Sequence, residues 1–296
     1  MRVLVTGWFS FDEVIATVGD ELGADAVVGW LRELGIDHDV AWAPYLGRGP
    51  HWRDLDASGY THLVFVSGPL MDMPLLRELT AAFDHAQRWA VNVSVVPDDA
   101  RPLFHRVWER DDVSTGTARP DLAIGTTTPD VPVVAVAFAP AQEEYGTRSQ
   151  ADRVRATIEG WLKTRGMPWF ELDMDLFDKP YERFPSQVEA LVRRADVVVS
   201  MRLHALVLGL AHDVPVIACD AVAGGAKVSA QAAALGWPVV LQAGEVDPAT
   251  LDAALEHALS GTLTGELAEA RRRGAAGNAA ARAWFVEQLG DGRPER

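Results

Sequence analysis

The sequence predicts an α/β protein made of two doubly wound units. Short apolar runs alternate with amphipathic stretches along most of its 296 residues, as expected where helices join the strands of a largely parallel sheet. The alternation weakens once, between residues 97 and 130, and this stretch ends in the turn-forming segment 125–130. We therefore place one domain at residues 1–125 and a second at 126–296, and the chain length also favours two domains.

The first unit is expected to begin with a strand at residues 2–6 and a helix at 20–34. Within that helix Leu22, Ala26 and Trp30 recur at helical spacing, and a glycine follows its last residue. The unit continues with strands at residues 39–42, 61–67 and 89–96 and a helix at 74–87.

The second unit begins with a continuous apolar run at residues 131–138, which is typical of a strand covered by helices on both faces. From Thr264 onward, alanine-rich and arginine-rich helix formers predict a closing C-terminal helix. Between these two, the alternation predicts helices at 148–165, 185–194, 204–211 and 248–259 and strands at 169–172, 196–200, 214–219 and 239–242.

Composition limits the classes of function. Hydrophobic residues make up 48% of the chain, enough for real cores, and the 27 basic against 42 acidic residues give a net charge of −15. A field of that sign repels phosphate backbones and anionic membranes, so nucleic acid is not an expected partner. An anionic small substrate would need a local cluster of basic side chains.

The single cysteine, Cys219, lies in an apolar run and excludes an intrachain disulfide or a cysteine zinc cluster. We expect it to be a buried strand residue. The N-terminus begins with a short strand rather than a targeting segment, and no apolar stretch reaches the roughly 18 residues of a membrane span. A cytoplasmic location is the simplest expectation.

The most informative segment follows the strand at 196–200, where Arg202 and His204 occupy the first turn of an apolar helix. Ligands of open α/β sheets bind beyond the carboxyl ends of the strands, where helix N-termini attract anions. An arginine offers a planar fork of donors to carboxylate or phosphate, and a histidine exchanges protons near neutral pH. The alternative is structural, an arginine on a surface carboxylate and a histidine satisfied in the helix. The apolar residues of this helix already supply its buried face, which favours function.

Other candidates lie at the same kind of position. Lys227 follows the next strand and the pair Gly224-Gly225, which favours a phosphate-binding role on the same rim. In the first unit, Asp12 and Asp20 are candidates for orienting acceptor hydroxyls. Asp20 is equally explained as an ordinary acid at a helix N-terminus.

Several well-known sites are missing from the sequence. Gly7 stands alone after the first strand, so the G-x-G-x-x-G spacing of a dinucleotide-binding fold is absent and a dehydrogenase is disfavoured. The histidines show no H-E-x-x-H spacing, and no metal is required. A phosphate-binding loop and a G-x-S-x-G nucleophile elbow are absent as well.

These residues resemble a known family. Ser200-Met-Arg-Leu-His-Ala-Leu-Val-Leu-Gly-Leu-Ala, with Val214-Pro-Val-Ile-Ala and Lys227, is similar to the core motif of the polysaccharide pyruvyl transferases. The N-terminal loop that starts at Gly7, the later Gly19-Asp-Glu, and Ala118-Arg-Pro-Asp-Leu-Ala also resemble segments of that family.

The resemblance implies two Rossmann-like domains facing each other across a cleft, the glycosyltransferase-B arrangement. It implies phosphoenolpyruvate as donor substrate, bound by the C-terminal domain, a glycan or glycoside acceptor on the N-terminal domain, and no tightly bound cofactor. Arg202 and His204 would hold the donor, and His204 would take part in proton transfer. Lys227 would contact the donor phosphate or carboxylate. The resemblance also implies a further arginine, for which Arg148 is the better candidate and Arg153 the alternative.

On the same resemblance, Ser200 of the core motif joins the donor site. Gly7, Asp12 and Asp20 belong to the acceptor side, with Asp12 catalytic. The sequence departs from the family at Ser67-Gly-Pro-Leu, where members commonly have a glycine-rich turn. Two other functions stay open at this point, a nucleotide-sugar glycosyltransferase of the same fold and a non-catalytic member of the family.

Overall fold

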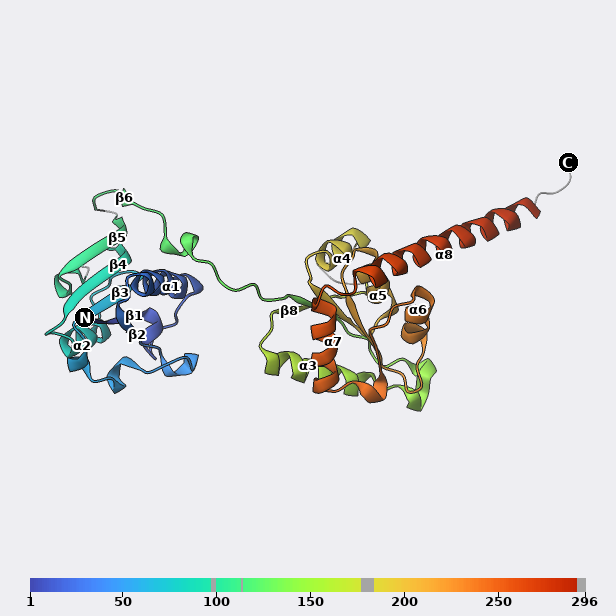
Figure 1. Cartoon of the computed structure of the whole chain (residues 1–296), viewed down its shortest axis with the longest axis horizontal. Helices are drawn as coiled ribbons and strands as arrows, with labels where there is room; N and C mark the ends of the chain where they lie inside the picture. The colour runs from blue at the N-terminus through green and yellow to red at the C-terminus, as the bar shows by residue number, and fades with distance from the viewer. Residues whose placement is uncertain (97–99, 113, 177–183, 292–296) are drawn as a thin grey trace. The chain divides into compact units, whose positions relative to one another are not determined.

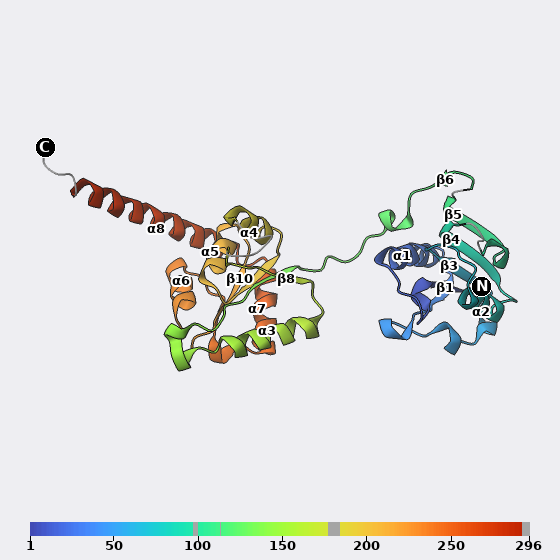
Figure 2. The ribbon, with the colours of Figure 1, turned by 180° about the vertical axis from the view of Figure 1, so that it is seen from behind.

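A computed structural model describes residues 1–96, 100–112, 114–176 and 184–291 of the chain (Figures 1 and 2). It divides into two compact units, Met1–Pro129 and Asp130–Arg296. The division lies inside the segment 125–130, where the sequence indicates a linker. Each unit is described by itself below.

The first unit is a six-stranded sheet with a helix on each face. The order is β2-β1-β3-β4-β5-β6, and the first five strands run parallel while β6 pairs antiparallel to β5. The helices are α1 (Val18–Glu33) and α2 (Pro74–Ala82). The strands are β1 (Arg2–Gly7), β2 (Asp37–Val40), β3 (His62–Val66), β4 (Gln87–Val95), β5 (Arg106–Asp112) and β6 (Thr117–Ala118).

The alternation of side chains along β1 explains the two layers. Val3 and Val5 point to the face where they pack with Val27 of α1, whereas Leu4 belongs to the opposite core with Leu76 of α2. Successive residues of a strand point to opposite faces, so one apolar run serves both helices.

The second unit is a five-stranded parallel sheet in the order β11-β10-β9-β7-β8. Helices α3 and α7 contact each other, while α5 contacts α4, α6 and α8, so both faces are covered (Figure 2). The strands are β7 (Val134–Ala137), β8 (Trp169–Glu171), β9 (Val197–Ser200), β10 (Val216–Asp220) and β11 (Val240–Gln242). The helices are α3 (Ala151–Arg165), α4 (Pro185–Val192), α5 (Leu203–Ala211), α6 (Lys227–Leu235), α7 (Pro248–Leu259) and α8 (Thr264–Asp291).

Both sheets share one strand order. Numbered within its own unit, the second sheet and the five parallel strands of the first run 2-1-3-4-5, which is one of the two common doubly wound orders. In such a sheet the order in which strands are added reverses between strands 1 and 3, and ligands bind at their carboxyl ends. This point lies between β1 and β3 in the first unit and between β7 and β9 in the second. The two doubly wound α/β units predicted from the sequence are therefore confirmed.

Some predicted elements were wrong. The weak stretch at 97–130 contains β5 and β6. Strand β5, which has only the two-residue β6 outside it, carries charged residues and the exposed Trp108 and does not show the apolar pattern of a buried strand. The helix predicted to reach residue 87 ends five residues earlier, at Ala82, and residue 87 is instead the first residue of β4. The helix predicted from 148 begins at Ala151, and α6 was not predicted.

Among the described residues, no helix combines the length and the hydropathy that crossing a membrane requires.

The position of Cys219 yields a direct test of the core. Its side chain is fully buried in β10, and burial raises the pKa of the thiol to about 12. Because the thiolate is the reactive form, we expect a thiol reagent at pH 8 to label the protein only as fast as it unfolds. Labelling in native buffer and in guanidinium chloride measures this, and rapid stoichiometric labelling of the native chain would contradict the buried assignment.

Candidate functional site

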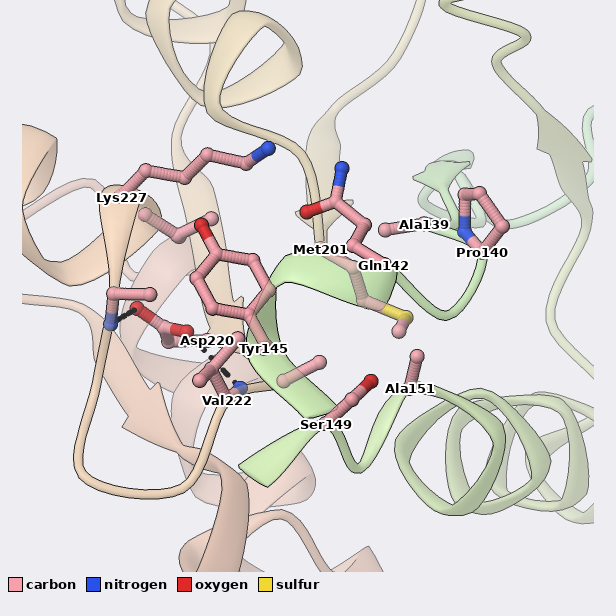
Figure 3. A pocket seen from close by; sticks show the side chains of 13 residues that line it. Ala139, Pro140, Gln142, Tyr145, Ser149, Ala151, Met201, Asp220, Val222 and Lys227 are labelled. Carbon is pink, nitrogen blue, oxygen red and sulfur yellow. Dashed lines mark hydrogen bonds between the residues drawn. The ribbon is translucent and has the colours of Figure 1, made fainter. Parts of the chain in front are cut away.

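The carboxyl ends of β7, β9 and β10 surround a small hollow in the second unit (Figure 3). Its volume is about 20 Å³, room for a single water molecule, so a larger ligand could rest only at its mouth. Residues at or just after the ends of these three strands line it, together with residues from the longer segment after β7 and from the first turns of α3 and α6. They include Ala139, Met201, Asp220, Gln142, Tyr145 and Lys227.

Ser200 at the end of β9 sets the start of α5. Its hydroxyl accepts a hydrogen bond from the Arg202 backbone N–H at 3.0 Å and donates one to the Arg202 carbonyl at 2.6 Å. The Met201 N–H donates to the Ala137 carbonyl of β7. This turn makes Arg202 the N-cap of α5, and no side chain caps the helix there. Ser200 therefore fixes backbone geometry at the sheet edge.

The Arg202 guanidinium is held on two sides. Its Nε donates to the Phe138 carbonyl at 2.7 Å. Its Nη1 and Nη2 donate to the two carboxylate oxygens of Asp175 at 2.9 and 2.6 Å. The side chain of Asp175 is 60% exposed, whereas that of Arg202 is 21% exposed. Arg202 thus binds a surface carboxylate of its own chain, the contact that the structural alternative predicted for it, and its donor-binding role stays a prediction.

His204 lies in the first turn of α5 and is exposed. Arg202 and His204 are not among the described residues that line the hollow, whereas Lys227 is. Since β9 and β10 are neighbours and α5 contacts α6, all three start from adjacent strand ends on one edge of the sheet.

Asp220, which the sequence analysis did not single out, anchors the loop before α6. Its carboxylate accepts hydrogen bonds from the backbone N–H groups of Val222 at 3.1 Å, Ala226 at 2.7 Å and Ser229 at 2.9 Å. The residue is 1% exposed. An anion therefore already occupies the positive end of α6. The sequence did contain a signal for this role, because an aspartate that ends an apolar strand just before a glycine pair is well placed to bind the backbone of the following loop.

Lys227 is the first residue of α6 and is exposed. Its Nζ lies 5.9 Å from the centre of the Tyr145 ring. Figure 3 shows the Tyr145 hydroxyl and the amide end of Gln142 directed toward the same open side as this ammonium. The mouth of the hollow therefore offers an ammonium, a hydroxyl and an amide, groups that suit an anion or a sugar hydroxyl.

Arg148 has a structural partner. Its Nε and Nη2 donate to the backbone carbonyls of Ala223 at 3.0 Å and Gly225 at 2.9 Å. Arg153 likewise donates to the carbonyl of Ala243. Arg148 therefore ties the segment after β7 to the loop after β10, and it is not among the described residues that line the hollow.

The first unit carries a larger pocket, of about 370 Å³, at the carboxyl ends of β1 and β3. That volume is in the range of small-molecule sites. Apolar and aromatic side chains form much of its lining, and a few polar groups interrupt them, as ligand pockets usually show. The apolar members are Trp8, Val14, Ile15, Met71 and Met73, and the polar ones are Thr17, Asp20, Arg110 and Asp121.

The turn after β3 shapes this pocket around Trp8. Gly68 has φ +76°, and a Cβ there would lie 2.1 Å from Cδ1 of the Trp8 ring, so only glycine fits. The indole N–H of Trp8 donates to the Pro69 carbonyl at 3.2 Å. At Gly7 the backbone is extended, but a Cβ would lie 2.7 Å from the Val66 carbonyl oxygen. The segment Ser67-Gly-Pro-Leu, where the sequence departs from the family pattern, thus positions the Trp8 ring that forms one wall of the pocket.

Two strained residues sit at the same edge. Ser67 and Asn92 have φ of +66° and +59°, in the left-handed region that residues other than glycine seldom adopt. The Asn92 amide donates to the Ser67 hydroxyl at 3.2 Å, and Asn92 also interrupts the register between β4 and β5. Such strain clusters at functional sites and is maintained by the surrounding structure.

Asp20 forms a capping box with Thr17. Its carboxylate accepts from the Thr17 N–H and hydroxyl, each at 2.9 Å, while its own N–H donates to the Thr17 hydroxyl. The helix-terminal role that the sequence left open for Asp20 accounts for these contacts. Asp12 is exposed in the turn two residues before Val14 and is not among the described lining residues.

Arg110 was missed because it lies in the stretch interpreted as linker. Its guanidinium donates to Asp111 at 2.8 Å, to Asp121 at 2.5 Å and to the Ser94 hydroxyl. Burial alone would raise the pKa of Asp121, but the Ala123 N–H and Arg110 hold its pKa below the usual value. Asp121 therefore faces the pocket as a carboxylate, an acceptor for hydroxyl groups.

Comparisons with known proteins address the family and the fold. The family model of polysaccharide pyruvyl transferase matches residues 76–221, which include Arg148, Ser200, Arg202 and His204. No protein of curated function matches the chain.

Among solved structures, the glycotransferase of kitacinnamycin is 12% identical, over 97% of this chain and 98% of that chain, with a TM-score of 0.36. The glycosyltransferase SnogD from Streptomyces nogalater is 12% identical, over 96% and 99%, with a TM-score of 0.30. UDP-GlcNAc 2-epimerase from Methanocaldococcus jannaschii is 9% identical, over 88% and 94%, with a TM-score of 0.30.

The buried carboxylate of Asp220 leads to a stability prediction. Asp220→Ala leaves three backbone N–H groups without their anionic acceptor, and we expect it to lower the free energy of unfolding by about 2 to 4 kcal/mol. Asp247→Ala, at the exposed cap of α7, is the matched control and should cost about 1 kcal/mol. Urea unfolding measures both, and equal losses would contradict the anchoring role of Asp220.

Proposed function

Since the chain belongs, over residues 76–221, to the polysaccharide pyruvyl transferase family, we propose that it transfers pyruvate from phosphoenolpyruvate to hydroxyl groups of a sugar-containing acceptor. The observation that supports this most directly is that Arg202, the uncapped start of α5 and Lys227 lie at adjacent strand ends of one sheet edge. The bond from Arg202 to Asp175 displays the geometry in which this guanidinium binds a planar carboxylate, and phosphoenolpyruvate carries one.

In this proposal the donor carboxylate replaces Asp175. The side chain of Asp175 is 60% exposed, so water can solvate its carboxylate when a ligand takes its place on Arg202. Arg202 does not depend on Asp175 for its position, because the Phe138 carbonyl and the Ser200 turn hold it independently. The guanidinium is therefore preorganised for the donor.

The donor phosphate is assigned to the start of α5 and to Lys227. Two helices begin at this sheet edge, but the carboxylate of Asp220 already binds backbone N–H groups at the start of α6. No side chain caps α5, which leaves the N–H groups of its first turn for an anion. The exposed ammonium of Lys227 adds a positive charge against the chain's background of −15.

His204 is assigned the proton transfer. Its imidazolium form would give a proton to the methylene carbon of phosphoenolpyruvate, which makes the central carbon cationic and open to attack by an acceptor hydroxyl. The attacking oxygen loses its proton, and the bond between the central carbon and the phosphate oxygen breaks to release inorganic phosphate. A second hydroxyl that attacks the same carbon closes a ketal, and the released phosphate carries its proton away.

The acceptor is assigned to the pocket of the first unit. Its aromatic wall at Trp8 and the carboxylates of Asp20 and Asp121 suit the apolar faces and the hydroxyls of a sugar. Asp12 is proposed to take the hydroxyl proton from its exposed turn. Gly7 contributes by allowing the close approach of β1 to the Val66 carbonyl.

Phosphate release tests the function. With phosphoenolpyruvate and a panel of glycosides, wild-type protein should release phosphate, and His204→Gln and Arg202→Ala should each lower kcat/KM by about 100-fold. His257→Gln and Lys163→Met, both at exposed helix positions, are matched controls and should leave turnover unchanged.

Three outcomes would contradict the proposal. Unchanged turnover in both variants would remove Arg202 and His204 from the mechanism. Thermal stabilisation by nucleotide sugars but not by phosphoenolpyruvate would favour the glycosyltransferase alternative. Binding of phosphoenolpyruvate without phosphate release on any glycoside would favour a non-catalytic member of the family.

The exchange of Asp175 for the donor gives a second prediction. Asp175→Asn removes a competing carboxylate, and we expect it to tighten phosphoenolpyruvate binding by about two- to fivefold, the range of an exposed ion pair. Calorimetric titration measures the change, with Glu159→Gln, which removes the exposed partner of Arg155, as the control. Weaker binding in Asp175→Asn would show that Asp175 positions Arg202 instead.

A further inference from the structure

Helix α8 extends well beyond the body of its unit. Its first residues pack against α5 and α6, with Leu267 and Ala270 buried (Figure 1). From residue 275 to 289 every residue is exposed, and both views show the helix leaving the unit. A helix of that length is marginal in water by itself, and Gly277 weakens it further. Within the described part of the second unit, no neighbouring element buries this segment.

The exposed end of α8 is apolar. Trp284, Phe285, Val286 and Leu289 are each more than half exposed, and we call them the terminal apolar turn. Neighbouring exposed residues of this size mark an interaction surface rather than a scattered apolar group.

The same helix borders an unfilled groove. The α8 groove, of about 330 Å³, has a mainly apolar lining from three helices. It is formed by Val207 and Leu210 of α5, Leu235 of α6, and Ala270, Gly274 and Ala275 of α8. The small residues of α8 leave its floor open to large side chains.

The groove and two residues of the terminal apolar turn, Phe285 and Leu289, lie on one face of α8, whereas Trp284 and Val286 point about 100° to either side of Phe285. Asn278 borders the groove, and Phe285 and Leu289 follow it by about two and about three helical turns. Side chains at those spacings share a helix face. Each chain therefore presents an unfilled apolar groove and exposed apolar side chains on one stripe along α8. The two features lie about 20 Å apart along the helix.

We propose that α8 pairs antiparallel with α8 of a second copy of this chain. A two-fold axis close to Ala281 places the terminal apolar turn of each copy against the α8 groove of the other, so the surface is complementary to itself. The alanine-rich stretch between them, at residues 275–283, lets the two helices approach closely. The resulting dimer rests on the second unit alone and is independent of the proposed catalytic function.

The mass of the full chain in solution tests the pairing. Light scattering after size exclusion should give twice the chain mass at micromolar concentration, and Phe285→Asp with Leu289→Asp should weaken dimerisation by about 100-fold. Both side chains are exposed, so the variant should keep the far-ultraviolet spectrum of the wild type. A monomeric wild-type chain, or a dimer unaffected by the double variant, would overturn the proposal.

Cross-linking tests the antiparallel geometry separately. Ala281→Cys lies on the stripe near the axis, whereas Ala280→Cys lies on the opposite side of the helix and is its matched control. Because the native Cys219 is buried, each variant has one accessible thiol in the described part of the chain. Mild oxidation should link Ala281→Cys into covalent dimers at least tenfold faster than Ala280→Cys, and equal rates would overturn the arrangement.

Discussion

The second unit depends on three parallel strands, β7, β9 and β10, that end side by side at one edge of the sheet. Parallel pairing points their carboxyl ends the same way, so the residues that follow each strand must meet there. Phe138 after β7 accepts from Arg202 after β9, and Asp220 at the end of β10 organises the loop that carries Lys227. Without the register of these strands, none of these groups would share a surface.

Two carboxylates divide the electrostatic roles at this edge. Asp220 is buried and holds three backbone N–H groups, so its loss leaves donors unpaired in the interior. Asp175 is 60% exposed and holds the Arg202 guanidinium from the solvent side. The buried anion therefore closes the start of α6, whereas the proposed function requires the exposed one to give way to the donor carboxylate. The net charge of the chain opposes anionic ligands in general, and it does not distinguish the different roles of the Asp220 and Asp175 carboxylates.

The sequence predicted most of the fold and the position of Arg202, His204 and Lys227 just after neighbouring strands of one sheet. Buried parallel strands such as β9 were readable because both of their faces are apolar, and the turn holding Arg202 and His204 stood out against the apolar residues of α5. Strand order was not readable, because it depends on contacts between segments far apart in the chain. Arg110 was missed because β5, which lies near the edge of its sheet, is too polar to resemble a strand. Arg148 illustrates a different limit, since residue type and position do not tell whether a guanidinium faces a ligand or two backbone carbonyls.

The most direct test of the account is a crystal structure of the chain with phosphoenolpyruvate. The account predicts the donor carboxylate on Nη1 and Nη2 of Arg202, with Asp175 turned away into solvent and the phosphate at the first turn of α5. Donor density elsewhere, with the bond between Arg202 and Asp175 intact, would contradict it.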